Sequence, residues 1–356
     1  MTPITARAIL TPALVVDCKV LDQNIKAAHS RIAETGLRIR PHVKTHKSLK
    51  IARRQLAAGA VGISVATIGE AEIFSQICDD IFIAYPLWPD EDQFSRLSLL
   101  SRHCKRLAIG VDSIQGVEHL AGSLPNAVEL MIEVDSGHHR SGCPPAEAGT
   151  IAKSALTHDL KFRGVFTFPG HSYDPDGTRT ATFDESLALE QATKSVRETT
   201  GLSSIELSGG STPSFRNTSD KTLTETRPGV YVFNDAQQWE LGTVGPESIA
   251  LSAYARVMSA REGYIVLDSG SKILGADKAP YSTGFGRLLD FPNARIVQLS
   301  EHHAVVAIKD GPARGSTVRV VPNHVCNAVN LVNELFPINC IEAPTSWPVD
   351  ARGRNR

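Results

Sequence analysis

The segment VGISVATIGEAEIFSQICDDIFIAY (61–85) shows the pattern on which the fold prediction depends: a β-branched run, a longer stretch and a second β-branched run. Similar short runs recur from Ala13 to about Phe233, separated by amphipathic stretches such as Leu21–Thr35. This alternation is typical of βα units around a parallel sheet. The predicted strands are ALVVD (13–17), LRIRPHV (37–43), VGISVAT (61–67), IFIAY (81–85), RLAIGVD (106–112), VELMIEVD (128–135), FRGVFTF (162–168), SIELSGG (204–210) and VYVF (230–233).

These nine predicted strands are one more than a closed eight-stranded barrel needs, so the first or the last belongs elsewhere. The spacing favours a (β/α)8 barrel, with a doubly wound open sheet as the alternative, because periodicity does not reveal closure. After about Gln238, predicted strands follow one another through short polar loops, which indicates an all-β domain. We expect a barrel over residues 1–238, with a first strand that can join the other domain, and a C-terminal β-domain over 239–356.

Composition and charge exclude several classes of protein. The 356 residues include 37 Lys and Arg against 38 Asp and Glu, so no overall basic field is available for nucleic acid or an anionic membrane. No stretch reaches the ~20 apolar residues of a transmembrane helix, and the first residues lack the apolar core of a signal peptide. We expect a cytoplasmic protein with six reduced, scattered cysteines and a frayed tail, PVDARGRNR (348–356).

The predicted strand 37–43 carries an unusual group of cations. Arg38, Arg40, His42 and Lys44 alternate with other residues and so share one face of an extended chain. Barrel strands are normally buried on both faces, so the pattern indicates either a solvated edge strand or a polar site at the C-terminal mouth of the barrel. Among other cations the ammonium form of a lysine is disfavoured, which makes Lys44 a candidate for binding a carbonyl group.

The residues around Lys44 resemble those of a known family. RPHVKTHK (40–47), after TPALVVD (11–17) and before GEAE (69–72), is similar to the pyridoxal-phosphate lysine segment of the D-threonine aldolase and D-serine dehydratase family, relatives of the alanine racemase barrel enzymes. The similarity continues in order through nearly the whole chain. It implies that Lys44 holds pyridoxal 5'-phosphate covalently and that a β-domain follows the barrel.

Three further segments resemble the cofactor site of that family. EVDSGHHRSG (133–142) implies an arginine beside the oxygen of the pyridoxal ring, whereas a plain surface arginine would pair with Asp135. LSGGSTPS (207–214) has the glycines and hydroxyls of a phosphate-binding turn, and RPGVYVFND (227–235) resembles the segment with a tyrosine near the pyridine nitrogen. The residues implied to bind the cofactor are Lys44, Arg140, Gly209, Gly210, Ser211, Thr212 and Tyr231.

PGHSY (169–173) also resembles the dehydratase branch. His171 and Tyr173 are candidate pocket residues without an assigned role. Phe168 stands where the family often has a histidine near the cofactor, which implies that its ring packs against the cofactor. A phenol is a poor counter-charge for a pyridinium, so Tyr231 would leave the electron sink weak, and a second electrophile is expected.

VPNHVCNAVNL (321–331) places His324 and Cys326 two residues apart. On an extended strand these side chains share a face, so an imidazole and a thiolate could bind one ion; a core histidine and an inert cysteine are the alternative. The family binds a divalent ion through a His-x-Cys or His-x-Asp pair here, which implies a metal site at His324 and Cys326. The thiolate favours zinc over magnesium or calcium, and manganese is an alternative ion.

Together these segments predict a pyridoxal-phosphate- and divalent-metal-dependent lyase acting on 3-hydroxy D-amino acids. Cys326 favours a D-serine or 3-hydroxy-D-aspartate dehydratase, because the dehydratase branch resembles His-x-Cys and the aldolase pattern is His-x-Asp. D-threonine aldolase is the alternative, and an amino-acid racemase and a non-catalytic pyridoxal-phosphate-binding protein are further ones. The resemblance also implies a homodimer with a small D-amino acid substrate; neither nucleic acid nor a membrane is expected as a partner.

Overall fold

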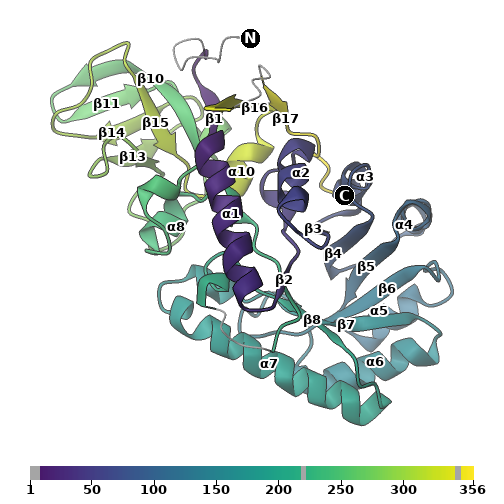
Figure 1. Cartoon of the computed structure of the whole chain (residues 1–356). Coiled ribbons are helices and arrows are strands. Elements are labelled where there is room, and N and C mark those ends of the chain that lie inside the picture. The colour runs from purple at the N-terminus through teal and green to yellow at the C-terminus, as the bar shows by residue number, and fades with distance from the viewer. Residues whose placement is uncertain (1–8, 218–221, 341–345) are drawn as a thin grey trace. The chain divides into compact units, whose positions relative to one another are not determined.

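The computed structural model describes residues 9–217, 222–340 and 346–356, and the chain divides into two compact units (Figure 1). The first unit comprises Met1–Ala27, Thr45–Arg54 and Val230–Gly353. The second unit comprises Ala28–Lys44, Gln55–Gly229 and Arg354–Arg356. Each unit is therefore built from segments that are far apart in the sequence.

The second unit contains a parallel barrel. Its eight strands follow the order β2-β9-β8-β7-β6-β5-β4-β3. The amides of Val61 and Ser64 donate to the carbonyls of Ile39 and Pro41 at 3.0 and 2.8 Å, which joins the β3 side to the β2 side. This confirms the predicted (β/α)8 class over the open sheet. The strands are β2 (Arg38–Ile39), β3 (Ile63–Val65), β4 (Asp80–Pro86), β5 (Arg106–Val111), β6 (Val128–Glu133), β7 (Lys161–Phe166), β8 (Glu206–Gly209) and β9 (Glu225–Thr226).

Helices cover the outside of these strands, as Figure 1 shows for α3, α4, α6 and α7. Side-chain caps begin several of them: the Thr67 hydroxyl accepts from the amide of Glu70, and Asp90 and Gln93 form a capping box. Strand residues are buried on both faces, which explains the nearly continuous apolar runs. The helices are α1 (Cys18–Glu34), α2 (Leu49–Ala57), α3 (Ile68–Phe74), α4 (Glu91–His103), α5 (Ile114–Leu120), α6 (Ala148–Thr157) and α7 (Gly177–Thr200); α1 and α2 continue across unit boundaries.

Charged residues close the amino-terminal end of the barrel. The fully buried Arg40 donates to Glu225 at 2.9 Å and to Asp80 at 2.8 Å, and Arg163 lies within 4.0 Å of the same Glu225. Burial alone would raise the pKa of Glu225, but the charges of Arg40 and Arg163 outweigh it and lower that pKa to about 2. Carboxylates therefore neutralise Arg40, one of the cations that the interpretation of Lys44 counted beside it.

Two of the nine predicted strands lie outside the barrel. ALVVD (13–17) is β1 (Ala13–Asp17), which pairs with β10 and β16 in the first unit. VYVF (230–233) is not a strand, because Val230–Val232 forms the single 3₁₀ turn η6. The eighth barrel strand is instead the two-residue β9, which is too short to show periodicity in the sequence.

The first unit contains a closed antiparallel barrel. Strands β11-β14-β13-β12-β15-β10 follow one another, and the β10–β11 pairing closes the ring. The predicted all-β domain is confirmed. The elements are β10 (Leu251–Arg261), β11 (Tyr264–Leu267), β12 (Arg287–Leu288), β13 (Arg295–Leu299), β14 (Ala304–Ala307) and β15 (Thr317–Val321), extended by β1, β16 (Glu334–Ile338) and β17 (Trp347–Pro348), with helices α8 (Ala236–Glu240), α9 (Ser271–Leu274) and α10 (Val325–Asn330).

The expectation of six reduced cysteines is wrong, because Cys18 and Cys340 form a disulfide with Cα atoms 5.3 Å apart. Strands β1 and β16 are parallel neighbours, with Asp17 opposite Ile338. The residues that follow the two strands therefore emerge at the same end of the sheet. This topology brings together two cysteines that are 322 positions apart.

The expectation of a frayed C-terminus is also wrong. The hydroxyl of Thr67 donates to the carbonyl of Arg354 at 2.5 Å, and the amide of Gly69 donates to the carbonyl of Arg356 at 3.1 Å. Residues 354–356 thus provide acceptors for the start of helix α3, whose first amides have no partner within the helix.

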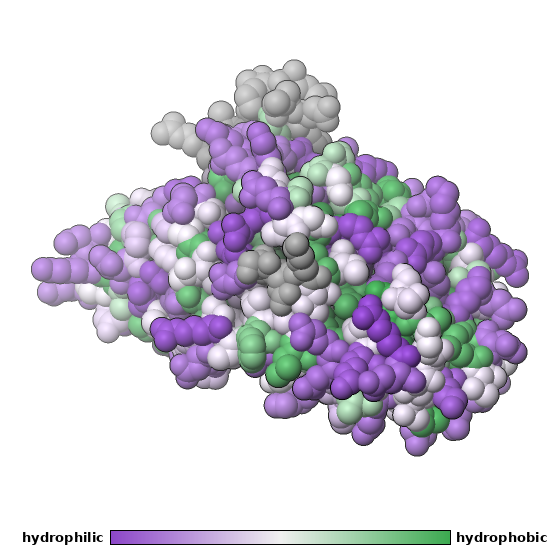
Figure 2. Space-filling view, turned by 60° about the horizontal axis from the view of Figure 1, so that its bottom comes forward, coloured by the Kyte–Doolittle hydropathy of each residue, from purple (hydrophilic) through white to green (hydrophobic). Residues whose placement is uncertain are grey.

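The surface mixes polar and apolar side chains. Figure 2 shows one face on which hydrophilic residues surround small hydrophobic groups. Folded proteins leave much apolar area in contact with water, so this mosaic identifies no particular partner. Within the described residues, no helix combines the length and the apolar character needed to cross a membrane.

Candidate functional site

Lys44 lies in the 3₁₀ turn η2 (Val43–Thr45) after β2, which is only two residues long where a strand over 37–43 was predicted. Its Nζ atom is 5.9 Å from the centroid of the Phe168 ring. The guanidinium carbon of Arg140 is 5.0 Å from the same centroid. Phe168 follows β7, so all of these groups stand at the carboxyl end of the parallel strands, where barrel enzymes place their chemistry. The second unit therefore brings Lys44 and Arg140 to one aromatic ring.

Two more aromatic side chains pack against Phe168. The His138 ring meets it edge-on at 5.5 Å, and the Tyr173 ring lies 6.3 Å away. Burial lowers the pKa of His138, and the charges of Arg140 and His171 lower it further. Sequence reasoning assigned nothing to His138, because a lone histidine in a glycine-rich loop is not specific for a site.

His171 belongs to the turn η4 (Gly170–Tyr173), where its Nε2 is 3.3 Å from a carboxylate oxygen of Asp184 on α7. Neither ring nitrogen of His171 makes a hydrogen bond to a described residue, so this contact is an ion pair when the imidazole is protonated, and an imidazole beside a carboxylate is a common acid–base arrangement. Asp184 was missed in the sequence because it lies in an ordinary amphipathic helix with no motif around it. The pair gives His171 a definite partner, which the sequence alone did not indicate.

Arg140 does not make the surface ion pair that was its alternative interpretation. Asp135 instead binds His139, accepting from its Nδ1 at 2.6 Å and its amide at 3.0 Å. The nearest carboxylate to Arg140 belongs to Glu133, at 4.0 Å. About half of the Arg140 side chain is exposed, so its charge remains accessible to an anionic or polar ligand.

The glycine–serine turn after β8 is tightly built. Gly210 has φ +79°, and a Cβ atom there would collide with the hydroxyl of Thr226. The Gly210 amide donates to Glu185 Oε1 at 2.6 Å, and the Ser211 hydroxyl lies 2.7 Å from that of Ser172. Since Glu185 occupies the Gly210 amide, this amide is not open to a phosphate. The hydroxyl groups of the turn are the better candidates.

The predicted cofactor residues are divided between the units. Lys44, Arg140 and residues 209–212 belong to the second, whereas Tyr231 belongs to the first. Tyr231 is buried in η6, beside Val232, whose carbonyl accepts from the Asn24 side chain at 3.1 Å. Within the second unit, an amine, a guanidinium, an aromatic wall and a hydroxyl-lined turn suit the carbonyl, ring and phosphate of pyridoxal phosphate.

His324 and Cys326 come together, although not on an extended strand. His324 is the N-cap of α10, and Cys326 is the second residue of that helix, so the predicted strand geometry is wrong. Burial would lower the pKa of His324, but the charge of Cys326 and a hydrogen bond to it raise that pKa to about 9. Cys326 Sγ also lies 3.3 Å from the hydroxyl of Thr45, within hydrogen-bond distance.

This donor pair suits a soft divalent cation such as zinc. Across the described part of the chain, no cluster of three or more His, Cys, Asp or Glu side chains could hold a metal ion. Two protein ligands would leave coordination positions for water or a substrate oxygen, and an open position is what distinguishes catalytic from structural zinc sites.

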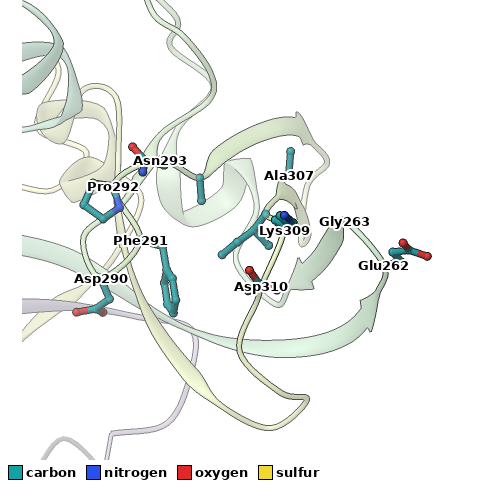
Figure 3. A pocket seen from close by; sticks show the side chains of 11 residues that line it. Glu262, Gly263, Asp290, Phe291, Pro292, Asn293, Ala307, Lys309 and Asp310 are labelled. Carbon is teal, nitrogen blue, oxygen red and sulfur yellow. The ribbon is translucent and has the colours of Figure 1, made fainter.

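A separate surface pocket of about 940 Å³ lies in the first unit (Figure 3). It is bounded by the turn 262–263, the loop 290–294 and residues 307–310. Figure 3 shows the Phe291 ring and the acidic side chains of Glu262, Asp290 and Asp310 around it. None of the predicted cofactor or metal residues lines this pocket, so it is not connected with the predicted chemistry.

Two family models match the chain. Residues 16–237 match the model described as "Alanine racemase, N-terminal domain", and residues 250–338 match the "Putative serine dehydratase domain". The D-threo-3-hydroxyaspartate dehydratase of Delftia sp. (strain HT23) is 33% identical, over 89% of this chain and 90% of the relative. The D-serine dehydratase of Dictyostelium discoideum is 27% identical, over 92% and 93% of the two chains.

Solved structures agree with this match. The D-threonine aldolase from Filomicrobium marinum superposes with a TM-score of 0.88 at 26% identity, over 99% of this chain and 98% of that one. A variant of D-threo-3-hydroxyaspartate dehydratase in a metal-free form gives 0.86 at 28% identity, over 96% and 97%. The chain belongs to the family in which an alanine racemase N-terminal domain precedes a serine dehydratase domain, a family of pyridoxal-phosphate-dependent dehydratases and aldolases of D-amino acids.

Proposed function

We propose that this chain is a pyridoxal-phosphate- and divalent-metal-dependent lyase that dehydrates D-serine or 3-hydroxy-D-aspartate to a keto acid and ammonia. The observation that carries the proposal is the approach of Lys44 and Arg140 to the Phe168 ring, at 5.9 and 5.0 Å. Two cations on one partly buried aromatic ring suit a planar, carbonyl-bearing cofactor better than a solvated surface. The relative that is 33% identical is named as a dehydratase of 3-hydroxyaspartate, which supports this substrate class.

Each predicted residue has a role in this proposal. Lys44 would hold the cofactor, Arg140 would lie beside its ring oxygen, and Tyr231 beside its ring nitrogen. The turn of Gly209, Gly210, Ser211 and Thr212 would face its phosphate. When bound, pyridoxal phosphate withdraws electrons from Cα of an amino acid. Once it is free of the cofactor, the amine of Lys44 would be the base that takes the Cα proton.

His324 and Cys326 would bind the divalent cation. Zinc is the favoured ion, and manganese is the alternative. Such a cation acts as a Lewis acid on an oxygen and helps a β-hydroxyl to leave. Thr45, which contacts Cys326 at 3.3 Å, follows Lys44 directly in the sequence. The resemblance to the family supports a reaction in which Lys44 is the base and this cation assists the leaving group.

D-threonine aldolase is the second candidate. A retro-aldol cleavage needs a base for the β-hydroxyl proton, and the His171–Asp184 pair, 3.3 Å apart, is an acid–base pair of the kind required. Cleavage of the Cα–Cβ bond would release glycine and an aldehyde. The D-threonine aldolase structure with a TM-score of 0.88 supports this candidate as well.

Product analysis distinguishes the candidates. The purified protein is incubated with D-serine, D-3-hydroxyaspartate and D-threonine, with and without EDTA followed by added zinc or manganese. A keto acid and ammonia, lost with EDTA and restored by metal, support the dehydratase. Glycine and an aldehyde identify the aldolase, and a change of optical rotation without either product identifies a racemase.

The matched variants test the residues. Lys44→Ala should abolish both turnover and the visible absorbance of the bound cofactor, whereas Lys50→Ala, at an exposed position, should change neither. Cys326→Ala should lose both metal binding and turnover. Cys104→Ala is its control and should lose neither. Visible absorbance without turnover on any hydroxy amino acid would overturn the lyase and leave a cofactor-binding protein.

The proposal includes a homodimer, which the resemblance to the family supports, and keeps the cytoplasmic location expected from the sequence. Sedimentation equilibrium at micromolar concentration tests the dimer, and a single monomer mass would contradict it. Fractionation of the source cells tests the compartment.

A further inference from the structure

The N-terminal turn of α8 is bound to the segment that carries the two proposed metal ligands. The amides of Ala236 and Gln237 donate to the carbonyls of Pro322 and Asn323 at 3.0 and 3.2 Å. In the opposite direction, the amide of Val325 donates to a carboxylate oxygen of Asp235 at 3.1 Å. Residues 235–237 and 322–325 are therefore joined by backbone and side-chain bonds from both sides.

Asp235 is fully buried, and its carboxylate accepts hydrogen bonds from both segments. One carboxylate oxygen accepts from the Gln238 amide as the N-cap of α8, and the other accepts from Val325, the residue between the two ligands. A carboxylate that caps one helix and binds the first amide of another holds both helix ends in a defined position. The backbone between His324 and Cys326 is thereby attached to α8.

Gln237 contacts the imidazole itself. Its side-chain carbonyl Oε1 lies 3.3 Å from His324 Nδ1, and Gln237 is buried. A carbonyl oxygen only accepts, so this contact requires a proton on Nδ1, and the lone pair stands on Nε2 once that nitrogen has given up its own proton. Nε2 is then the nitrogen available to a metal, which is the arrangement that an outer acceptor imposes on a ligating histidine.

The second ligand has a partner of its own. Cys326 Sγ and the hydroxyl of Thr45 lie 3.3 Å apart, and Thr45 is buried. When the thiol loses its proton on metal binding, the hydroxyl can turn to donate to the sulfur. Each of the two proposed ligands thus has one polar partner from outside the His-x-Cys segment.

On the basis of the metal site proposed above, we propose that Gln237 is the positioning residue that sets the His324 tautomer for a divalent cation, with Asp235 holding the backbone between the two ligands. Gln237 does not touch the metal. It acts through the imidazole, so its loss should weaken metal binding without removing a ligand. Losing such an outer partner typically lowers metal affinity about 10- to 100-fold.

Zinc affinity, measured by competition with a chromophoric chelator, tests this role on the full chain loaded with pyridoxal phosphate. Gln237→Met keeps the length of the side chain and removes the acceptor, so zinc should bind about 10- to 100-fold more weakly. Gln237→Glu keeps an acceptor and should retain the affinity of the unmodified chain. Gln298→Met makes the same chemical change at an exposed position of β13 and should have no effect.

A second variant covers the case in which Gln237→Met does not fold. Gln237→Asn keeps the amide but withdraws it by one methylene, so it should weaken zinc binding as Gln237→Met does. Unfolding temperatures of the metal-free proteins and the visible absorbance of the bound cofactor should stay unchanged in both variants.

The outcomes separate this role from the metal site itself. If His324→Ala abolishes zinc binding while Gln237→Met and Gln237→Asn bind zinc as the unmodified chain does, the positioning role is overturned and the metal site stands. If His324→Ala and Cys326→Ala leave zinc affinity unchanged, the metal site of the proposed function fails, and the role of Gln237 fails with it.

Discussion

The Nζ atom of Lys44 lies 5.9 Å from the centre of the Phe168 ring, and Arg140 approaches the same ring at 5.0 Å. An aromatic face attracts a cation through its quadrupole, and such a contact contributes about 0.5–1 kcal/mol where water still reaches it. Phe168 therefore does not only pack against its neighbours after β7. It holds two cations of like charge close together in the second unit.

Phe168→Leu keeps an apolar side chain but removes the aromatic face. With about 0.5–1 kcal/mol lost for each cation, we expect kcat/KM on D-serine or D-3-hydroxyaspartate to fall about five- to thirtyfold while the cofactor stays bound. Steady-state kinetics and visible absorbance measure the two effects. Phe183→Leu, at an exposed position on α7, is the matched control, and equal kinetics for both variants would contradict the role of Phe168.

Gly210→Ala should destabilise the protein more than Gly36→Ala. Both glycines have positive φ, +79° and +76°, so a Cβ is unfavourable at either position by about 1 kcal/mol. Only at Gly210 would that Cβ also collide with Thr226, since nothing lies within 4 Å of it at Gly36. Thermal unfolding of both variants measures the difference. Equal losses of thermal stability in the two variants would show that the turn after β8 relaxes around the added Cβ atom without a further loss of stability.

Glu225 should make the protein sensitive to acid. Its pKa is lowered from the usual 4.5 to about 2, because the charges of Arg40 and Arg163 outweigh burial. A lowered pKa in the folded state stabilises the fold fully above about pH 4.5, and this stabilisation is lost as the pH falls toward 2. Urea unfolding between pH 7 and pH 2 measures it.

Glu225→Gln is the variant for that experiment. It leaves the buried Arg40 without one of its carboxylates, which should cost about 3–5 kcal/mol at neutral pH. Stability should then change less between pH 4.5 and pH 2 than in the unmodified chain. The exposed Glu262→Gln should preserve the original pH dependence, and an unchanged slope in Glu225→Gln would refute the assignment.

The disulfide predicts a thiol count. Cys18 and Cys340 are paired, and Cys78, Cys104, Cys143 and Cys326 are not in disulfides. Thiol titration in denaturant should therefore find four thiols before reduction and six afterwards. Cys340→Ser should lower the free energy of unfolding by about 2–5 kcal/mol, because the unfolded chain is no longer cross-linked. Six thiols without reductant would show that the pair does not form.

Much of the architecture could be predicted from the sequence, because it rests on local patterns. Alternating β-branched runs and amphipathic stretches indicated the parallel barrel, and the change of pattern after Gln238 indicated the β-domain. The errors are those that local patterns allow. A two-residue strand, β9, has no period to detect, and VYVF looks like a strand although it forms a 3₁₀ turn.

The sequence by itself determined which residues carry the candidate chemistry: a lysine in RPHVKTHK, an arginine in EVDSGHHRSG, and a histidine and a cysteine two positions apart. Their side-chain chemistry does not depend on the fold. The tertiary structure alone decided their partners: carboxylates that neutralise Arg40, a glutamate that occupies the Gly210 amide, and Gln237 beside His324. Charge compensation and hydrogen bonding act over a few ångströms. In the chain, Glu225 and Asp80 lie 185 and 40 positions from Arg40, Glu185 lies 25 from Gly210, and Gln237 lies 87 from His324.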